Sequence, residues 1–200
     1  MSEDKEKSFE RKEELINTAM KEFGEKGYRN ASLNNILKEV GISKGTFYYH
    51  FKNKESLYIY LINMLVDRKI KFFEYNIPKE AYEKDLFELL KVYTIVGMKF
   101  AKENPYIASF SQTLMSNRDS DINKKVMNDV AGERQDYMVV LINRAYDRGE
   151  IRNDLSRNFV SNLIIHLFAN IYELTSIDKI EDFEPALENL IKFLKNGLAK

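Results

Sequence analysis

The sequence predicts an all-α protein with about nine helices. Two observations support this fold class. Only 3 prolines and 8 glycines occur among 200 residues, so few positions interrupt a regular backbone. Apolar residues recur at spacings of three and four along almost the whole chain, which is the period of an amphipathic helix. We expect two domains, an N-terminal one of three helices (residues 1–54) and a larger helical one (residues 55–200).

The first two helices have recognisable ends. The first is expected to end at Gly27, and its apolar face comprises Leu15, Ile16, Ala19, Met20 and Phe23. Ser32 is expected to cap the second helix, because its hydroxyl can accept a hydrogen bond from an otherwise unpaired backbone N–H. Gly41 ends that helix, since glycine adopts the left-handed conformation without a Cβ clash. Its apolar face comprises Leu33, Ile36, Leu37 and Val40.

The third helix is short and places different chemistry on its two faces. Ser43 caps it, and Phe47 and Phe51, four residues apart, face the core. Two short helices joined by a glycine turn are typical of a helix-turn-helix, whose second helix enters the DNA major groove. Gly45 lets the backbone approach a phosphate or a base edge closely. The face left for DNA comprises Lys44, Gly45, Thr46, Tyr48, Tyr49 and His50.

Positive charge is concentrated on this corner. Residues 28–54 contain five basic residues and one acidic residue, Glu39, and so carry a net charge of +4, whereas the whole chain has 31 of each sign. A local basic patch on a neutral chain is the electrostatic footprint of a nucleic-acid binder. Lys54 begins the next helix, where its charge and the helix dipole both favour a phosphate. The alternative is a tight corner of a helical bundle with no DNA contact.

The remaining chain predicts six further helices. One runs from Leu57 toward Tyr75 and ends before Pro78. The others are expected at 82–102, 106–115, from the polar loop 116–121 to Arg148, from an Asp154 or Ser156 cap to Ser176, and at 183–198.

The last two helices, residues 156–176 and 183–198, are expected to form a homodimer interface. Apolar residues cover more than one stripe of the first, so it must be covered on two sides. Two subunits would then form a four-helix interface, and their two reading helices, about 34 Å apart, would match a palindrome. The alternative is that both helices are buried in a large monomer core.

The region from residue 82 to residue 172 is rich in aromatic residues and methionine. Most of these side chains are expected in the core, but some can line an apolar cavity for a small ligand. No acidic cluster there indicates a cationic ligand and no basic pair indicates a carboxylate ligand, so a neutral or weakly polar hydrophobic ligand is expected. His166 is expected to be a satisfied core histidine rather than a specificity group. The candidate ligand-binding residues are Thr94, Met98, Phe110, Gln112, Tyr137, His166 and Asn170.

Composition argues against an enzyme. The chain has no cysteine and two histidines, and it contains no phosphate-binding glycine loop or metal-ligand spacing. We therefore expect no catalytic residue, no metal site and no cofactor. The charged start of the chain does not predict a signal peptide, and no apolar run approaches the roughly 20 residues that span a bilayer. These features favour a cytoplasmic protein without membrane contact.

Residues 16–28 and 41–57 together resemble the N-terminal domain of the tetracycline-repressor (TetR) family of bacterial transcriptional regulators. The resemblance is carried by the Gly27-Tyr28 pair, by Ser-Lys-Gly-Thr-Phe-Tyr from Ser43, and by Phe-Lys-Asn-Lys-Glu from Phe51. It implies a recognition helix at 43–50 with Lys44, Gly45 and Thr46 nearest the bases. It also implies backbone contacts from Tyr48, Tyr49 and His50, and phosphate contacts from Ser32 and Lys54.

The resemblance implies a homodimeric repressor that leaves a palindromic operator when a small, mostly hydrophobic effector binds. The alternative is a DNA-anchored protein-interaction module of the same fold with no small-molecule effector. A cavity of a few hundred Å³ in the larger domain favours the first function. An exposed apolar patch on a solid body favours the second.

Overall fold

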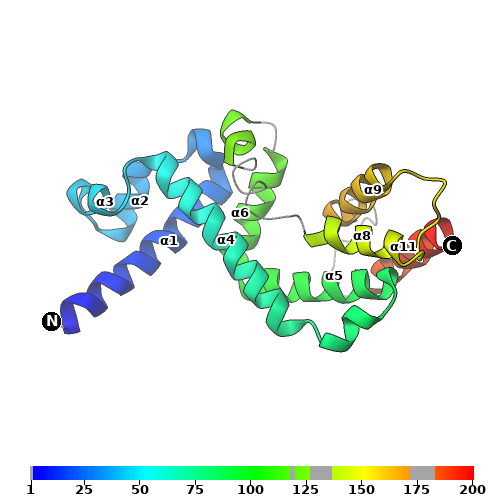
Figure 1. Ribbon diagram of the computed structural model, residues 1–200. Helices are drawn as coiled ribbons and strands as arrows, with labels where there is room; N and C mark the ends of the chain where they lie inside the picture. Colours follow the sequence, from blue (N-terminus) through cyan, green and yellow to red (C-terminus); the bar gives the residue numbers. More distant parts are fainter. Residues whose placement is uncertain (1, 118–119, 127–136, 172–182) are drawn as a thin grey trace. The chain divides into compact units, whose positions relative to one another are not determined.

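The computed structural model describes residues 2–117, 120–126, 137–171 and 183–200, and over these residues the chain is helical (Figure 1). Nine named α-helices, one 3₁₀ helix and a further helical segment at 121–126 occur in this part of the chain. Its only β-type pairing is an isolated antiparallel bridge between Ile151 and Ala199. The all-α prediction is therefore confirmed. No helix among the described residues is long and apolar enough to span a membrane.

The first four helices follow the predicted order. They are α1 (Ser2–Asn30), α2 (Leu33–Val40), α3 (Lys44–His50) and α4 (Lys54–Asn76), coloured blue to cyan in Figure 1. Regular helix geometry in α1 is interrupted at Gly27, which has φ 70° and ψ 169°. Gly41 follows α2 in the left-handed conformation, and its N–H bonds to the carbonyls of Leu37 and Lys38. Both glycine stops were predicted because only glycine adopts these angles without strain.

The next helices differ from the prediction at one boundary. A short 3₁₀ helix, η1 (Lys79–Glu83), precedes α5 (Leu86–Glu103), so the predicted start at residue 82 is wrong. The carboxylate of Asp85 explains the later start, because it accepts from the N–H of Glu88 at 2.9 Å and caps the helix. Helix α6 (Pro105–Ser116) has proline in its first turn, where a missing N–H costs nothing. A helical segment at 121–126 follows.

The last described helices are α8 (Tyr137–Asp147), α9 (Arg157–Ala169) and α11 (Phe183–Leu198). Ser156, not Asp154, caps α9 by accepting from the N–H of Phe159 at 3.3 Å. The predicted end of this helix at Ser176 is wrong for the described part, because α9 ends at Ala169 and Asn170 is its C-cap. The predicted continuation through 172–176 and the predicted helix over 127–136 lie outside the described residues.

The chain forms two compact units, one of residues 1–72 and 99–130 and the other of residues 73–98 and 131–200. In the first unit α6 packs along α1. Gly24 permits this approach, because a Cβ there would lie 2.9 Å from Oγ of Ser109 and 3.1 Å from the backbone nitrogen of Phe110. The predicted boundary after residue 54 stays a prediction.

In the second unit, the C-terminal helix α11 contacts Asp85, the residue that precedes α5. The core of this unit contains the fully buried side chains of Phe87, Leu90 and Ile142. Lys195 Nζ lies 2.7 Å from Oδ2 of Asp85, and the backbone N–H of Arg152 bonds to the carbonyl of Leu198 at 2.8 Å. These contacts order the last residues of α11.

Candidate nucleic-acid interface

Helix α3 buries one face and exposes the other, as predicted. The side chain of Phe47 is fully buried and stacks on the ring of Phe51 with centroids 5.7 Å apart. Ser43 caps the helix by accepting from the N–H of Thr46 at 3.1 Å. The opposite face is exposed and carries Lys44, Gly45, Thr46, Tyr48, Tyr49 and His50. This seven-residue helix therefore presents polar and aromatic groups outward on a rigid aromatic base.

The hydroxyls of this region are partly used for capping. Oγ of Ser43 lies 3.0 Å from Oγ1 of Thr46, so the two hydroxyls share a hydrogen bond. Oγ of Ser32 accepts from the N–H of Asn35 at 3.3 Å, which confirms Ser32 as the N-cap of α2. Each serine oxygen thus accepts a backbone bond, and this fixes the side chain at the start of its helix.

A buried carboxylate that the sequence reasoning missed fixes the start of α2. Glu22 accepts from the backbone N–H of Ser32 at 2.9 Å and from Nζ of Lys26 at 2.8 and 2.9 Å. Burial raises the pKa of this carboxyl, but the hydrogen bonds from Lys26 and Ser32 outweigh burial and hold the pKa below its ordinary value of 4.5. The sequence signal was the spacing of four between Glu22 and Lys26. The hydrogen bond from Ser32 to Glu22 depends in addition on the turn at Gly27.

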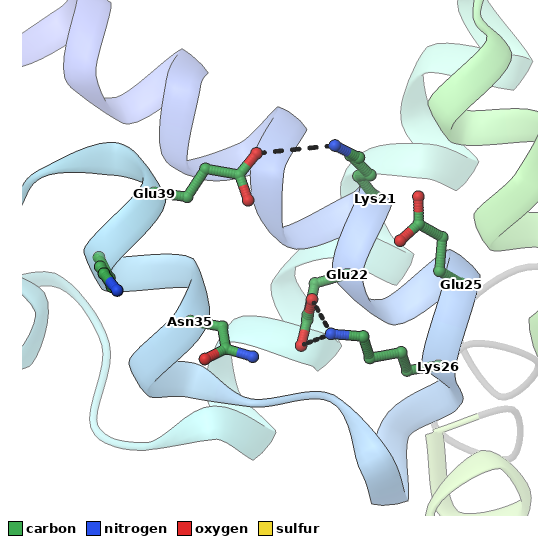
Figure 2. A pocket seen from close by; sticks show the side chains of 7 residues that line it. Lys21, Glu22, Glu25, Lys26, Asn35 and Glu39 are labelled. Atoms are coloured by element: carbon green, nitrogen blue, oxygen red, sulfur yellow. Dashed lines mark hydrogen bonds and ion pairs between the residues drawn. The ribbon is translucent and has the colours of Figure 1, made fainter.

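Between α1 and α2 lies a polar hollow of about 450 Å³, shown in Figure 2. Three lysines, three glutamates and Asn35 line it. Opposite charges pair within it: Lys26 with Glu22, and Lys21 with Glu39 at 3.7 Å. None of the predicted ligand-binding residues lines this hollow.

Lys54 lies against the end of α1. Its Nζ donates to the carbonyl oxygens of Tyr28 at 2.8 Å, Ala31 at 3.0 Å and Arg29 at 3.5 Å. The same nitrogen lies 4.7 Å from the centroid of the Tyr28 ring. An ammonium has three hydrogens, and these three carbonyls account for all of them. The described structure therefore places this predicted phosphate ligand on the carbonyl end of a helix, which also attracts cations.

An aromatic cluster in the first unit joins α1, α4 and α6. The ring of Tyr58 lies 4.9 Å from Phe23, 4.8 Å from Tyr28 and 5.5 Å from Phe110. The hydroxyl of Tyr58 donates to Oδ1 of Asn123 at 2.9 Å, and burial raises the pKa of Tyr58 to about 12. Phe110, predicted to contact a ligand, is thus placed within a packed cluster.

The other predicted ligand-binding residues are distributed over both units. Gln112 is exposed on α6, and Oγ1 of Thr94 donates to the carbonyl of Leu90 within α5 at 2.8 Å. The expectation that His166 is a core residue is wrong, because it lies exposed near the end of α9, where the Asn170 amide donates to its carbonyl at 2.8 Å. Met98 is half-buried on α5. The side chain of Tyr137 lies outside the described residues.

The predicted dimer helices leave large apolar side chains uncovered in the single chain. On α9 Val160 and Ile164 are fully buried, while Phe159 is 53% exposed. On α11 Phe183, Leu187 and Leu194 are buried, while Phe193 is 68% exposed. Half-buried leucines accompany these exposed rings: Leu163, Leu167 and Leu190.

Comparison with known proteins agrees with this geometry. A family model described as "Bacterial regulatory proteins, tetR family" matches residues 15–61. The chain is 39% identical over 85 residues to the uncharacterized HTH-type transcriptional regulator YerO of Bacillus subtilis, a match covering 38% of this chain and 29% of that relative. The negative transcriptional regulator IcaR of the biofilm operon icaADBC, from Staphylococcus aureus, is 28% identical over 165 residues, covering 80% of this chain and 82% of IcaR.

A solved structure has the same fold. A TetR family transcriptional regulator from Chloroflexus aurantiacus superposes with a TM-score of 0.76 at 23% identity and covers 98% of both chains. The family match covers α2, α3 and the start of α4, including the exposed face of α3, and the fold match covers nearly the whole chain. Residues 15–61 are therefore similar in sequence to bacterial regulatory proteins of the tetR family, and the chain shares the fold of a solved TetR family regulator.

Proposed function

We propose that this protein is a transcriptional regulator that reads duplex DNA with α3. The observation that carries the proposal is the two-faced character of α3, which anchors Phe47 in the core and exposes Lys44, Thr46 and Tyr49. This helix lies in a segment, residues 28–54, that carries the net charge of +4. A short helix with a basic, exposed N-terminal turn suits insertion in the major groove. The printed name of IcaR, a negative regulator, supports repression as the direction.

We propose that the exposed residues of α3 contact different parts of the DNA according to their position in the helix. Lys44, Gly45 and Thr46 lie in the first turn of α3, the part of a recognition helix that meets base edges. Tyr48, Tyr49 and His50 follow on the same exposed face and contact the sugar-phosphate backbone and the groove edge. The Ser32 and Ser43 hydroxyls donate to phosphates, since each oxygen already accepts a backbone bond. Lys54 contributes by holding the start of α4 against the end of α1.

We propose that the protein acts as a homodimer through α9 and α11. Phe159 and Phe193 expose large apolar surface on these helices, and such surface is stabilised when a second copy covers it. A twofold dimer places two α3 helices about one DNA turn apart, or a multiple of it, and so reads a palindromic operator. As a chromosome-binding regulator of a bacterial family, the protein would act in the cytoplasm.

We propose a small, mostly hydrophobic effector that releases the operator. The support is the content of apolar and weakly polar side chains in the second unit, where Thr94, Met98, His166 and Asn170 lie. Of the other residues predicted to bind a ligand, Tyr137 belongs to the second unit, and Phe110 and Gln112 belong to the first. Such coupling amounts to about 1–3 kcal/mol and is reciprocal, so operator must weaken effector binding as much as effector weakens operator binding.

A second candidate is a DNA-anchored protein-interaction module. Tyr106 and Met115 on α6 are exposed large apolar residues of the first unit, and the hollow between α1 and α2 is lined by charged groups rather than apolar ones. The exposed apolar side chains favour a protein partner at this helix. The two candidates share the same DNA-reading helix.

Selection from a pool of random duplexes tests the DNA-binding function. The purified protein should enrich a palindromic sequence, and fluorescence anisotropy should show binding that weakens steeply as salt rises. Failure to retain any duplex in dilute buffer would overturn the proposal. Titration calorimetry with the selected duplex and candidate effectors then separates the two functions. Reciprocal weakening supports the effector, and a protein that captures no small molecule and keeps its operator supports the interaction module.

A further inference from the structure

A lysine from outside the helix-turn-helix reaches the start of α4. Nζ of Lys125 lies 2.7 Å from Oε1 of Glu55. Glu55 is in the first turn of α4, whereas Lys125 belongs to the helical segment 121–126, 70 residues later in the chain. Both residues are in the first compact unit. The pair therefore connects the segment after α6 to the edge of the candidate nucleic-acid interface.

The backbone that carries Lys125 is firmly held. Two residues earlier, Asn123 is 1% exposed and accepts from the Tyr58 hydroxyl at 2.9 Å. Its amide donates to the carbonyls of Asn117 at 2.8 Å and Leu114 at 3.4 Å. Val126, the residue that follows Lys125, is also buried. Lys125 itself has a side chain that is 62% exposed, so it approaches Glu55 from a fixed position while facing solvent.

The negative charge of Glu55 has opposite effects on the stability of α4 and on DNA binding. An acidic residue in the first turn of a helix stabilises that helix, because the N-terminal end of the dipole is positive. The same charge near an approaching phosphate is repulsive. Lys54, its neighbour in sequence, is directed to the carbonyls of Tyr28 and Ala31 rather than to Glu55. Within the described contacts of this turn, Lys125 is the cation that pairs with Glu55.

We propose that Lys125 is a positioning residue for the DNA interface, which neutralises Glu55 so that a backbone phosphate can approach the start of α4. This inference rests on the proposed DNA-binding function. It extends the interface beyond residues 15–61, the segment that the family model matches. Lys125 acts through Glu55, and its removal leaves a carboxylate that repels every DNA sequence alike.

A double-mutant cycle tests the proposal. Lys125→Met should weaken binding of the selected duplex by about three- to tenfold at low salt and by less as salt rises, since the repulsion is screened. Glu55→Gln alone should bind close to wild type. The double variant Glu55→Gln/Lys125→Met should also bind close to wild type, because no charge is left to neutralise. A random-sequence duplex should show the same pattern as the selected one, because the repulsion acts on phosphates.

Controls separate this role from others. Lys124→Met removes the same charge one residue away and should leave affinity near wild type; an equal loss there would mean a net-charge effect and overturn the proposal. A double variant as weak as Lys125→Met would mean that Lys125 binds DNA by itself, which also overturns it. Thermal unfolding checks each variant, and Lys125→Gln replaces Lys125→Met if the latter fails to fold. If wild type binds no duplex, the DNA-binding function fails; if wild type binds and Lys125→Met matches it, this inference alone fails.

Discussion

The ammonium nitrogen of Lys54 lies 2.8 Å from the carbonyl oxygen of Tyr28 and 4.7 Å from the centroid of the Tyr28 ring. The first residue of α4 therefore closes the end of α1, 26 residues earlier in the chain. The Tyr28 ring in turn packs on Tyr58 of α4. These contacts hold the end of α1 against α4, and α2 and α3 lie between these two helices in the sequence.

Replacement of Lys54 by methionine is expected to destabilise the first unit. The variant loses charge-assisted hydrogen bonds to helix-end carbonyls, so the free energy of unfolding should fall by about 2 kcal/mol. The slope of log affinity against log salt should stay unchanged, because the ammonium is directed to protein carbonyls rather than to phosphate. Urea unfolding and anisotropy titrations at several salt concentrations measure both quantities.

Lys52→Met is the matched control, because Lys52 is an exposed lysine two residues earlier. If it contacts a phosphate, its loss lowers the salt slope by about 0.9 per subunit and leaves stability unchanged. A fall of the same size in the Lys54 variant would show that Lys54 binds phosphate as the family resemblance implies.

Lys44→Ala and Thr46→Ala are expected to change which operator is preferred. Both side chains are exposed in the first turn of α3, and each base contact is worth about 1–3 kcal/mol. Repeating the duplex selection with each variant should relax the preference at one position per half-site. Lys38→Ala, an exposed lysine on α2, serves as the control. Selection of an unchanged sequence by both α3 variants would refute this assignment of the reading residues.

Stability should fall below pH 4.5 in part through Glu22. Burial raises the pKa of this carboxyl, but its hydrogen bonds from Lys26 and Ser32 lower the folded-state pKa below the ordinary value of 4.5. The contribution is therefore complete above the unfolded-state pKa and is lost as the pH falls through the folded-state pKa. Denaturation of Glu22→Gln should show a deficit against wild type at pH 6 that shrinks as the pH falls below 4.5 and the carboxyl takes up a proton. A deficit independent of pH would contradict this account.

Phe193→Lys is expected to weaken the homodimer. Phe193 is 68% exposed on α11, and a lysine ammonium resists burial in an apolar interface. Sedimentation velocity should show a shift toward monomer, and operator binding should weaken with it. Tyr75→Lys is the matched control, since Tyr75 is 90% exposed near the end of α4, a helix that is not part of the proposed interface. A Phe193 variant that sediments like wild type would place the interface elsewhere.

Local signals in the sequence predicted most of the first unit correctly. Ser32 and Ser43 were recognised as caps because a serine cap bonds to an N–H three residues away, within the same stretch of chain. Gly41 was recognised because its conformation depends on one residue. Asp85 was missed as the cap of α5 although it has the same spacing, because the apolar pattern begins earlier and hid the boundary.

Contacts between distant residues could not be predicted in this way. Nothing in the spacing of Tyr58 and Asn123, 65 residues apart, predicts their hydrogen bond. His166 was expected in the core because its neighbours are apolar, but its exposure depends on which face of α9 packs inward. The same holds for the roles of Glu22 and Lys125.

The sequence by itself determined the helical fold class, the serine caps of α2 and α3, and the basic, exposed character of α3, because these depend on residues within one or two helical turns. Only the tertiary structure decided where the charged side chains are directed. It placed Lys54 on the end of α1 and brought Lys125 to Glu55. The physical reason is that a long, flexible lysine selects among all acceptors that folding brings within reach, and α1, α4 and the segment 121–126 meet only in the folded chain.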